Sequence, residues 1–370
     1  MILNKGKRHF LFWLCLLTVI LFTYFGLRHD ASLYSKPVVL IEKVKVIDEN
    51  NSTDAYLNRV TNYRQKVKAK FLNTDRQGEK IWIENNYDSS QGMDQKLKPK
   101  MQIFLRQQGD AWNFDNVKRD ATWIPLLIAL IGLLINLMGK SGRLTAISLV
   151  LNTILFIITI DLNLKTGTHY LLPLFVIFSL IVSALTLGLV MGFKKRQTWV
   201  IFATVVTTTL ITMLLAALVF KLNHNQGVNF ELLGFITQLP VPMFFSMTLV
   251  GVLGAVMDES TDMIATLFAL RKENHDVTTK ELIIAGRHVG QEIFGALTNV
   301  LFLIFIAGQI PMAILFLRNG NNIGYTYDMN MALGMVQTLI SAIGIVLTVP
   351  AGILWVIIDS KYEMHKRRLN

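Results

Sequence analysis

Residues 170–193 have the sequence YLLPLFVIFSLIVSALTLGLVMGF, and Lys194, Lys195 and Arg196 follow directly. The stretch carries no charge and is longer than the ~20 apolar residues with which a helix crosses the hydrocarbon core of a bilayer. The composition of the whole chain also indicates a membrane protein: of 370 residues, 52% are hydrophobic and 16% are charged, and the mean hydropathy is +0.45. Because a soluble domain carries about 25% charged residues, the composition predicts a membrane protein and argues against a soluble enzyme or a disordered chain.

Seven further apolar runs have a similar length, and the first begins close to the N-terminus. They cover residues 10–27, 123–138, 144–164, 199–222, 232–257, 289–317 and 336–358. Basic residues precede the first run, as they do in a signal peptide and in an anchor helix alike. A cleaved signal has an apolar region of about 7–15 residues that ends in small side chains. The first run is longer and ends in Phe25-Gly26-Leu27, which favours an uncleaved anchor, so we predict an α-helical protein with about eight spans.

The basic residues of the short loops predict the orientation, because Lys and Arg are enriched on the cytoplasmic side of a membrane. With the N-terminus inside and eight alternating spans, the inside segments hold sixteen Lys and Arg residues, while the short outside loops hold three. Both termini are then cytoplasmic, in a cell membrane, and residues 28–121 lie outside. The net charge of +11 is spread over the chain, so it indicates topology and not a nucleic-acid partner.

The hydrophilic segment 28–121 has the alternating pattern of half-buried strands. Apolar side chains alternate at Val67, Ala69 and Phe71, at residues 81–83 and at residues 101–105. A strand is also predicted at residues 38–47 and a turn at 73–78, whereas residues 48–62 are predicted to be a polar or partly helical insertion. Four or five short strands predict a small extracytoplasmic β-barrel of OB or SH3 type. The expected organisation is an anchor helix at 1–27, this β-rich domain at 28–121 and a seven-span membrane domain at 122–370.

Signatures of catalysis are missing from the sequence. It has no His-Glu-x-x-His, no Gly-x-Ser-x-Gly and no complete phosphate loop; Gly139-Lys140-Ser141 lacks the first glycine and the preceding strand of such a loop. The one cysteine, Cys15, allows neither a disulfide within the chain nor a cysteine-based metal site. We therefore expect neither an enzyme nor a bound cofactor.

Polar side chains gather where the sixth run ends and the seventh begins. Asp258 and Asp262 are four residues apart, as are His288 and Glu292, so each pair shares one face of a helix. If the two faces meet, they form a polar cluster between two spans. Its members are Asp258, Glu259, Asp262, Arg287, His288, Glu292 and Asn299.

Two interpretations of this cluster are open. A carboxylate near the bilayer centre costs about 2.5–3.5 kcal/mol on insertion scales, and such residues usually pair with a cation or mark an ion path. The cluster is then either a pocket for a proton, an ion or a substrate, or an ion-pair network of Asp258 or Asp262 with Arg287 that only joins two helices. His288 has no second histidine nearby, which disfavours a metal site. Pro311 interrupts the long seventh run, and broken helices beside polar residues are typical of transporters.

Three stretches of the membrane region resemble motifs of one protein family. Residues 251–258 (GVLGAVMD) resemble its span-ending aspartate motif, residues 290–299 (GQEIFGALTN) resemble its Gly-x-Asp/Glu-Ile-x-Gly-x-x-Thr-Asn motif, and residues 341–350 (SAIGIVLTVP) resemble its last-span motif. Together they are similar to the YibE/F family of bacterial multi-span membrane proteins, and the resemblance covers mainly residues 123–358. The chain departs from the pattern at Glu292, where the family usually has aspartate, and at Glu259 and Ser260, where small apolar residues are usual.

The resemblance implies the longer type of family member, which carries an extracytoplasmic β domain after its first span. It also implies, as partners beside the lipid bilayer, a shorter relative without that domain or a second copy of the chain. It implies no reaction and no substrate. From the residues themselves we expect a transporter, or a subunit of one, that uses the polar cluster. The alternative is a non-transporting scaffold or envelope-assembly factor whose outer β domain binds a partner.

Overall fold

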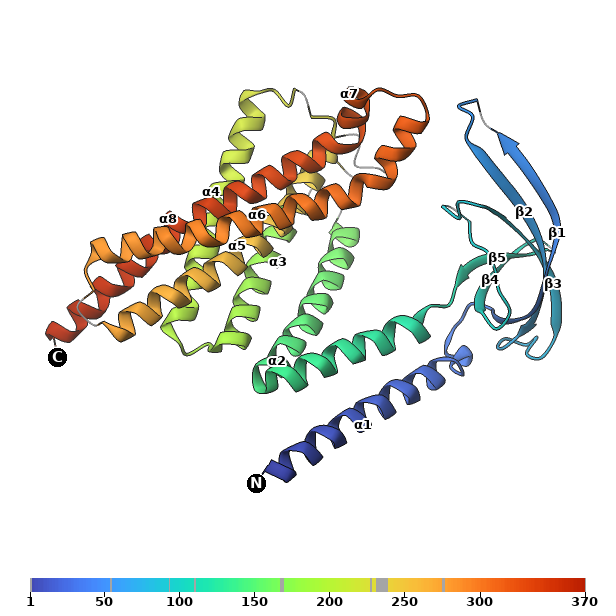
Figure 1. Ribbon diagram of the computed structural model, residues 1–370, viewed down its shortest axis with the longest axis horizontal. Coiled ribbons are helices and arrows are strands. Elements are labelled where there is room, and N and C mark those ends of the chain that lie inside the picture. Colours follow the sequence, from blue (N-terminus) through green and yellow to red (C-terminus); the bar gives the residue numbers. More distant parts are fainter. Residues whose placement is uncertain are drawn as a thin grey trace. The chain divides into compact units, whose positions relative to one another are not determined.

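The computed structural model describes residues 2–53, 55–92, 94–109, 111–166, 170–226, 228–230, 239–274 and 277–369. They form two compact units, Met1–Arg143 and Leu144–Asn370 (Figure 1). The first unit holds helix α1, a β domain and the first part of helix α2, and the second unit holds the remaining helices.

The β domain is a single antiparallel sheet with the strand order β3-β2-β1-β4-β5. Its strands are β1 (Val38–Thr53), β2 (Arg59–Phe71), β3 (Lys80–Asp88), β4 (Gln102–Gln108) and β5 (Ala111–Val117). The sheet is open, because in the described part of the chain β3 and β5 each pair with one neighbour only. The expected β domain is therefore present, but an OB or SH3 barrel is not confirmed.

The predicted strands lie where the apolar alternation placed them. One face of the sheet buries a core that contains Val39, Val67, Ala69, Ile83 and Ile103. The prediction of an insertion at residues 48–62 is wrong: β1 runs on to Thr53 and pairs with β2 as far as Arg59. This outer end of the hairpin needs no apolar face, because it is exposed and its polar side chains bond across the strands, as Thr61 Oγ1 does to Asn51 Oδ1 at 2.7 Å.

Asn73, in the predicted turn after β2, fastens the sheet to the segment that comes from α1. Its amide nitrogen donates to the carbonyls of Ala31, Tyr34 and Lys36 at 2.9–3.0 Å, and its side-chain oxygen accepts from Val38 N at 2.7 Å. Asn73 is buried, so these four bonds satisfy it completely.

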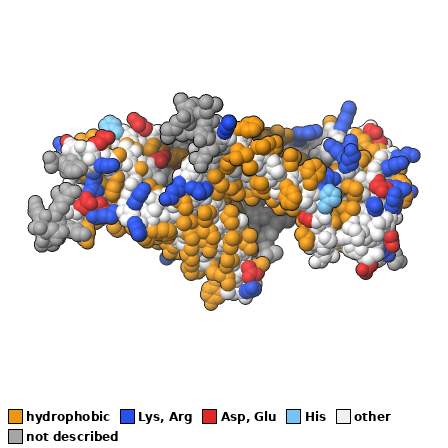
Figure 2. All heavy atoms as spheres, turned by 90° about the horizontal axis from the view of Figure 1, so that it is seen from below, with side chains coloured by type: hydrophobic (Ala, Val, Ile, Leu, Met, Phe, Trp, Pro, Cys, Tyr) orange, Lys and Arg blue, Asp and Glu red, His pale blue; other side chains and the backbone are white. Residues whose placement is uncertain are grey.

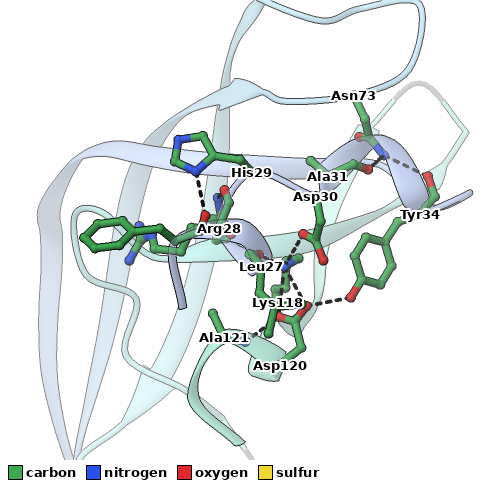
Figure 3. A network of polar contacts seen from close by, with 12 residues as sticks. Leu27, Arg28, His29, Asp30, Ala31, Tyr34, Asn73, Lys118, Asp120 and Ala121 are labelled. Atoms are coloured by element: carbon green, nitrogen blue, oxygen red, sulfur yellow. Dashed lines mark hydrogen bonds and ion pairs between the residues drawn. The ribbon is translucent and has the colours of Figure 1, made fainter. Parts of the chain in front are cut away.

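The two helices of the first unit are joined at their β-domain ends by one buried lysine (Figure 3). Lys118 Nζ lies 2.7 Å from Asp30 Oδ1 and 2.7 Å from Asp120 Oδ2, and it also donates to the carbonyl of Leu27, the last residue of α1 (Ile2–Leu27). Tyr34 donates to Asp120 at 2.7 Å, and this bond is the main reason why the pKa of the Tyr34 hydroxyl is raised. The side chain of Lys118 is 1% exposed, so its two carboxylates keep a buried charge paired.

Helix α2 (Asp120–Thr166) is two helical arms with a break at Gly139, where φ is 58°. A positive φ of this kind is strained for any residue with a Cβ. Close by, a Cβ on Gly142 would come within 2.1 Å of the Leu134 carbonyl oxygen, so the backbone turns sharply between these two residues of the first unit. The two arms correspond to the predicted runs 123–138 and 144–164.

The second unit contains α3 (Leu171–Leu187), the π-helix η3 (Gly188–Gly192), α4 (Arg196–Leu222), α5 (Pro240–Glu273), α6 (Thr279–Arg318), α7 (Ile323–Thr326), η5 (Tyr327–Met331) and α8 (Ala332–Leu369). Among the described residues, seven helices of the chain are long and apolar enough to cross a membrane, with α2 counted once. Their surfaces are largely hydrophobic in Figure 2, whereas blue Lys and Arg side chains gather on the β domain, at the right. Residues 232–238 of the predicted sixth run lie outside the described residues.

Helix α6 is continuous through Pro311, so the predicted interruption of the seventh run is absent. One proline frees only one backbone carbonyl, and a membrane helix tolerates that. The long helices α4, α5 and α6 all pack against α8 (Figure 1), and the core of the unit lies among them.

Candidate functional site

The three acids of α5 point in two directions. Asp258 and Asp262 share a face that is exposed, whereas Glu259 is 0% exposed. Each step along a helix turns a side chain by about 100°, so Glu259 joins the buried face of α5, beside Val256 and Met263. That face packs into the unit, and the Asp258 face does not.

Glu259 has no polar partner for either carboxyl oxygen in the described part of the chain. Burying an ionised carboxylate without a partner is very costly, and proteins avoid it by protonation or by pairing the charge. The surroundings of Glu259 therefore require a proton on the carboxyl or a cation beside it.

Two glycines of α8 show what lies opposite Glu259. A Cβ on Gly344 would lie 3.1 Å from the side chain of Val256 in α5 and 3.4 Å from Thr212 in α4, and a Cβ on Gly352 would lie next to Met263 in α5 and Thr204 in α4. These contacts mean that α8 runs parallel to α5 and antiparallel to α4. Halfway between the two glycines, Thr348 of α8 is level with Thr208 of α4 and with Glu259 and Ser260 of α5. All four of these side chains are 0% exposed.

The hydroxyls at this level differ in their bonding. Thr348 donates to its own helix at the Gly344 carbonyl, at 3.0 Å, whereas Thr208 Oγ1 and Ser260 Oγ have no partner among the described residues. Unpaired buried hydroxyls are rare in proteins. We name Thr208, Glu259, Ser260 and Thr348 the buried polar belt. Its hydroxyl and carboxyl oxygens can exchange a proton or replace water around a small cation.

An ion-pair cluster closes one end of the same three helices. Asp359 of α8 lies 2.7 Å from Arg196 of α4 and 3.0 Å from Arg271 of α5. Glu363, one turn further, bonds the same two arginines at 3.2 and 2.9 Å. Asp359 is eleven residues beyond Thr348, which is about 16 Å along a helix. A cavity of about 280 Å³ between α4 and α8 reaches Arg196 and Asp359 and is otherwise lined mainly by Trp199, Trp355 and Tyr362.

The polar residues of α6 lie apart from the belt. Helix α6 packs on α8 through its glycines: a Cβ on Gly286 would clash with Ile353, and one on Gly290 would clash with Val349. The predicted site residues lie on other faces of α6, and all four are exposed: Arg287, His288, Glu292 and Asn299. In the residues that the structure describes, no ion pair joins them to the acids of α5, whose own arginine, Arg271, binds α8 instead.

Thr208, Thr348 and Asp359 complete the site and are not among the site residues that the sequence predicted. One signal was available, because Thr204, Thr208 and Thr212 repeat every four residues and so share one face of α4. No such signal connects Thr348 or Asp359 to α5, since the register between two helices is set by packing.

Comparison with known families gives two matches. The sequence model of the YibE/F-like protein matches residues 126–358, and that of the YibE/F family N-terminal domain matches residues 32–117. The first match contains the buried polar belt, and the second spans the β domain. No curated protein and no solved structure matches the chain.

Proposed function

The chain belongs to the YibE/F-like family, and from this premise we propose that it is a membrane transporter, or a subunit of one, whose transport is coupled to protons at Glu259. The observation that carries the proposal is the complete burial of this carboxyl in a membrane helix, with no partner for either oxygen among the described residues. Ionisable groups inside membrane segments are costly and mark proton and ion pathways.

The belt gives Glu259 a way to take part in transport. A protonated Glu259 is neutral and suits the closed packing of α4, α5 and α8. Release of the proton leaves a charge that this packing disfavours, so it favours a second arrangement in which water or a cation reaches the carboxylate. Close packing at Gly344 and Gly352, on either side of Thr348, fixes the register of α8 in the closed arrangement, so the second arrangement requires these contacts to change.

The location that suits this function is the plasma membrane of a bacterium. The distribution of Lys and Arg favours cytoplasmic termini and an extracytoplasmic β domain. In this orientation the Arg196–Asp359–Arg271 cluster lies at the cytoplasmic end of the three helices, and Glu259 lies about 16 Å or more from that end.

The test is a proton-flux assay on the full chain in proteoliposomes that contain a pH-sensitive dye. An imposed pH gradient and potential are expected to drive a flux above that of empty liposomes. E259Q should abolish this flux, because the amide is nearly isosteric with the acid but carries no exchangeable charge. D258N and E292Q are the matched controls, since both remove an exposed acid, and each should keep at least half of the flux.

A second measurement separates loss of function from loss of fold. The hydrophobic reagent dicyclohexylcarbodiimide modifies protonated carboxyls in membranes, and mass spectrometry should find the adduct at Glu259 and less of it as the pH rises. Unchanged flux in E259Q, or a flux that falls equally in D258N, would contradict the proposal.

The alternative function, a scaffold whose β domain binds a protein partner, is favoured by the hairpin of β1 and β2. Two large apolar side chains at its tip, Tyr56 and Leu57, are exposed. Exposed large apolar groups on neighbouring residues occur at binding surfaces. Y56S/L57S would then abolish the cellular function of the protein, while E259Q would leave it intact; a transporter predicts the reverse.

A further inference from the structure

The face of the sheet opposite the apolar core is strongly basic. Because side chains alternate along a strand, the residues between the buried positions of β1, β2 and β3 all point to this outer face. They include seven Lys and Arg residues: Lys43, Lys45, Arg64, Lys66, Lys68, Lys70 and Lys80. Of these, Lys43, Lys45, Arg64, Lys66 and Lys80 are exposed, and Lys68 and Lys70 are half-buried. We name these seven residues the basic face.

The cations of the basic face are placed directly opposite one another. The register of the strands pairs Lys43 with Lys68, Lys45 with Lys66, and Lys70 with Lys80. Like charges in directly opposite positions destabilise a sheet. Two ion pairs reduce the repulsion between these cations: Lys80 with Glu42 at 3.1 Å and Arg64 with Asp48 at 3.9 Å. The register also places the exposed Glu84 of β3 opposite Lys66. Within the described residues, however, the other five lysines have no carboxylate within 4.0 Å.

One aromatic ring lies within this face. Trp82 of β3 is 51% exposed, and the ammonium groups of Lys66 and Lys68 lie 5.5 and 5.8 Å from its ring centre. The ring is therefore held between cations at the surface. A flat aromatic ring beside lysines suits a ligand that is anionic and also carries a sugar or another flat surface for stacking.

We propose that the basic face binds a linear, phosphate-bearing polymer. Successive outward side chains are about 6.8 Å apart along a strand, and neighbouring strands are about 4.8 Å apart. The lysines thus form a grid that contacts several phosphates of one chain at once. Neutralising them releases counterions and removes the repulsion between the paired lysines, and both effects favour binding.

A lipid surface suits the face less well. Peripheral binding to a bilayer uses an apolar face that enters the headgroup region, with cations around it. The register places one aliphatic side chain opposite a cation of this face, the half-buried Leu40 opposite Lys70, and the one aromatic ring lies beside two ammonium groups.

The test measures binding of fluorescently labelled long-chain inorganic polyphosphate to the full chain in zwitterionic nanodiscs. K66Q/K68Q should weaken the affinity at least tenfold and make it less sensitive to salt, because two phosphate contacts are lost. The matched control is K98Q/K100Q, which removes the same charge from exposed lysines. Both follow Leu97, which belongs to the core on the opposite face of the sheet, so the affinity should stay within twofold of the wild type.

Three outcomes would overturn the proposal. They are equal weakening in both double variants, unchanged affinity in K66Q/K68Q, and binding of the wild type to phosphatidylglycerol vesicles without binding to polyphosphate. The thermal midpoint of K66Q/K68Q should change little, because two like-charge pairs are relieved while two contacts of lysines with the Trp82 ring are lost. If it does fall, K43Q/K45Q removes the opposite members of the same pairs and must show the same tenfold loss.

Discussion

Replacing Glu259 with methionine is expected to stabilise the helices of the second unit. A buried polar group without a partner costs about 1–3 kcal/mol in proteins, and neither oxygen of Glu259 has a partner in the part of the chain that the structure describes. Methionine has a similar length and a flexible apolar side chain that fills irregular space. The free energy of unfolding should therefore rise by about 1–3 kcal/mol, which raises the thermal midpoint by about 2–4 °C per kcal/mol for a unit of this size.

A second substitution in the same unit should have the opposite effect. Asp359 is also buried, but it holds Arg196 and Arg271 at 2.7 and 3.0 Å. D359N is expected to lower the free energy of unfolding by about 1.5–3 kcal/mol, the usual worth of hydrogen bonds to charged groups. Glu363 still bonds both arginines, so the loss should not reach that of an isolated buried charge.

The assay is thermal unfolding of the full chain in detergent, followed by tryptophan fluorescence. Trp355 of α8 donates to Thr207 of α4 at 3.1 Å and so reports on the packing of these two helices. E292M is the control for E259M, because it removes an exposed acid, and it should change the free energy by less than about 0.5 kcal/mol. A lower thermal midpoint in E259M would mean that Glu259 has a stabilising partner. An equal rise of the thermal midpoint in E292M would mean that loss of charge alone stabilises the protein. Either result would refute the reasoning.

Three further predictions concern the first unit and the packing of glycines. K118M should destabilise the β domain by about 3–5 kcal/mol, because it leaves Asp30 and Asp120 without their cation. Amide exchange in β4 and β5 should then accelerate by a factor of 100 or more. The control is K36M, which breaks the exposed pair with Asp115 and should cost less than about 1 kcal/mol. K45E should stabilise the β domain by about 0.2–1 kcal/mol, since an attractive pair with Lys66 replaces a repulsive one. Its thermal midpoint should therefore rise slightly, and a fall would show that the register is different. G142A should lower the midpoint, with a cost of about 1–3 kcal/mol for overpacking against Leu134, whereas G254A, which meets nothing within 4 Å, should not.

The β domain illustrates which local patterns could be interpreted from the sequence. The alternation at Val67, Ala69 and Phe71 located β2 because one face of that strand is buried and the other is not. The outer half of β1 has no such contrast, since both of its faces are exposed, and the sequence pattern of residues 48–53 therefore resembles an insertion. Barrel closure depends on whether the edge strands β3 and β5 pair, which alternation within a strand does not encode.

In the candidate site, too, the sequence predicted the local spacing of residues but not which of them are buried. The spacing of Asp258 and Asp262 correctly puts them on one face of α5, but spacing does not say which face is inside. The glycines at positions 286 and 290 turn the buried side of α6 away from Glu292, and the fit of α8 against α5 directs Glu259 inward.

Sequence alone determined the apolar spans, the positions of the strands that alternate between a buried and an exposed face, and the membership of a family, because each depends on composition or on a short-range period. Tertiary structure alone decided that Glu259, and not its neighbour Asp258, is buried. It also decided that Thr208 and Thr348 share the level of Glu259, and that Asp359 pairs with Arg196 and Arg271. The physical reason is that close packing at Gly344 and Gly352, between residues far apart in the chain, sets the rotation and register of the helices. The rotation of a helix decides whether an acid on it is buried, and only a buried acid without a partner carries a large free-energy cost.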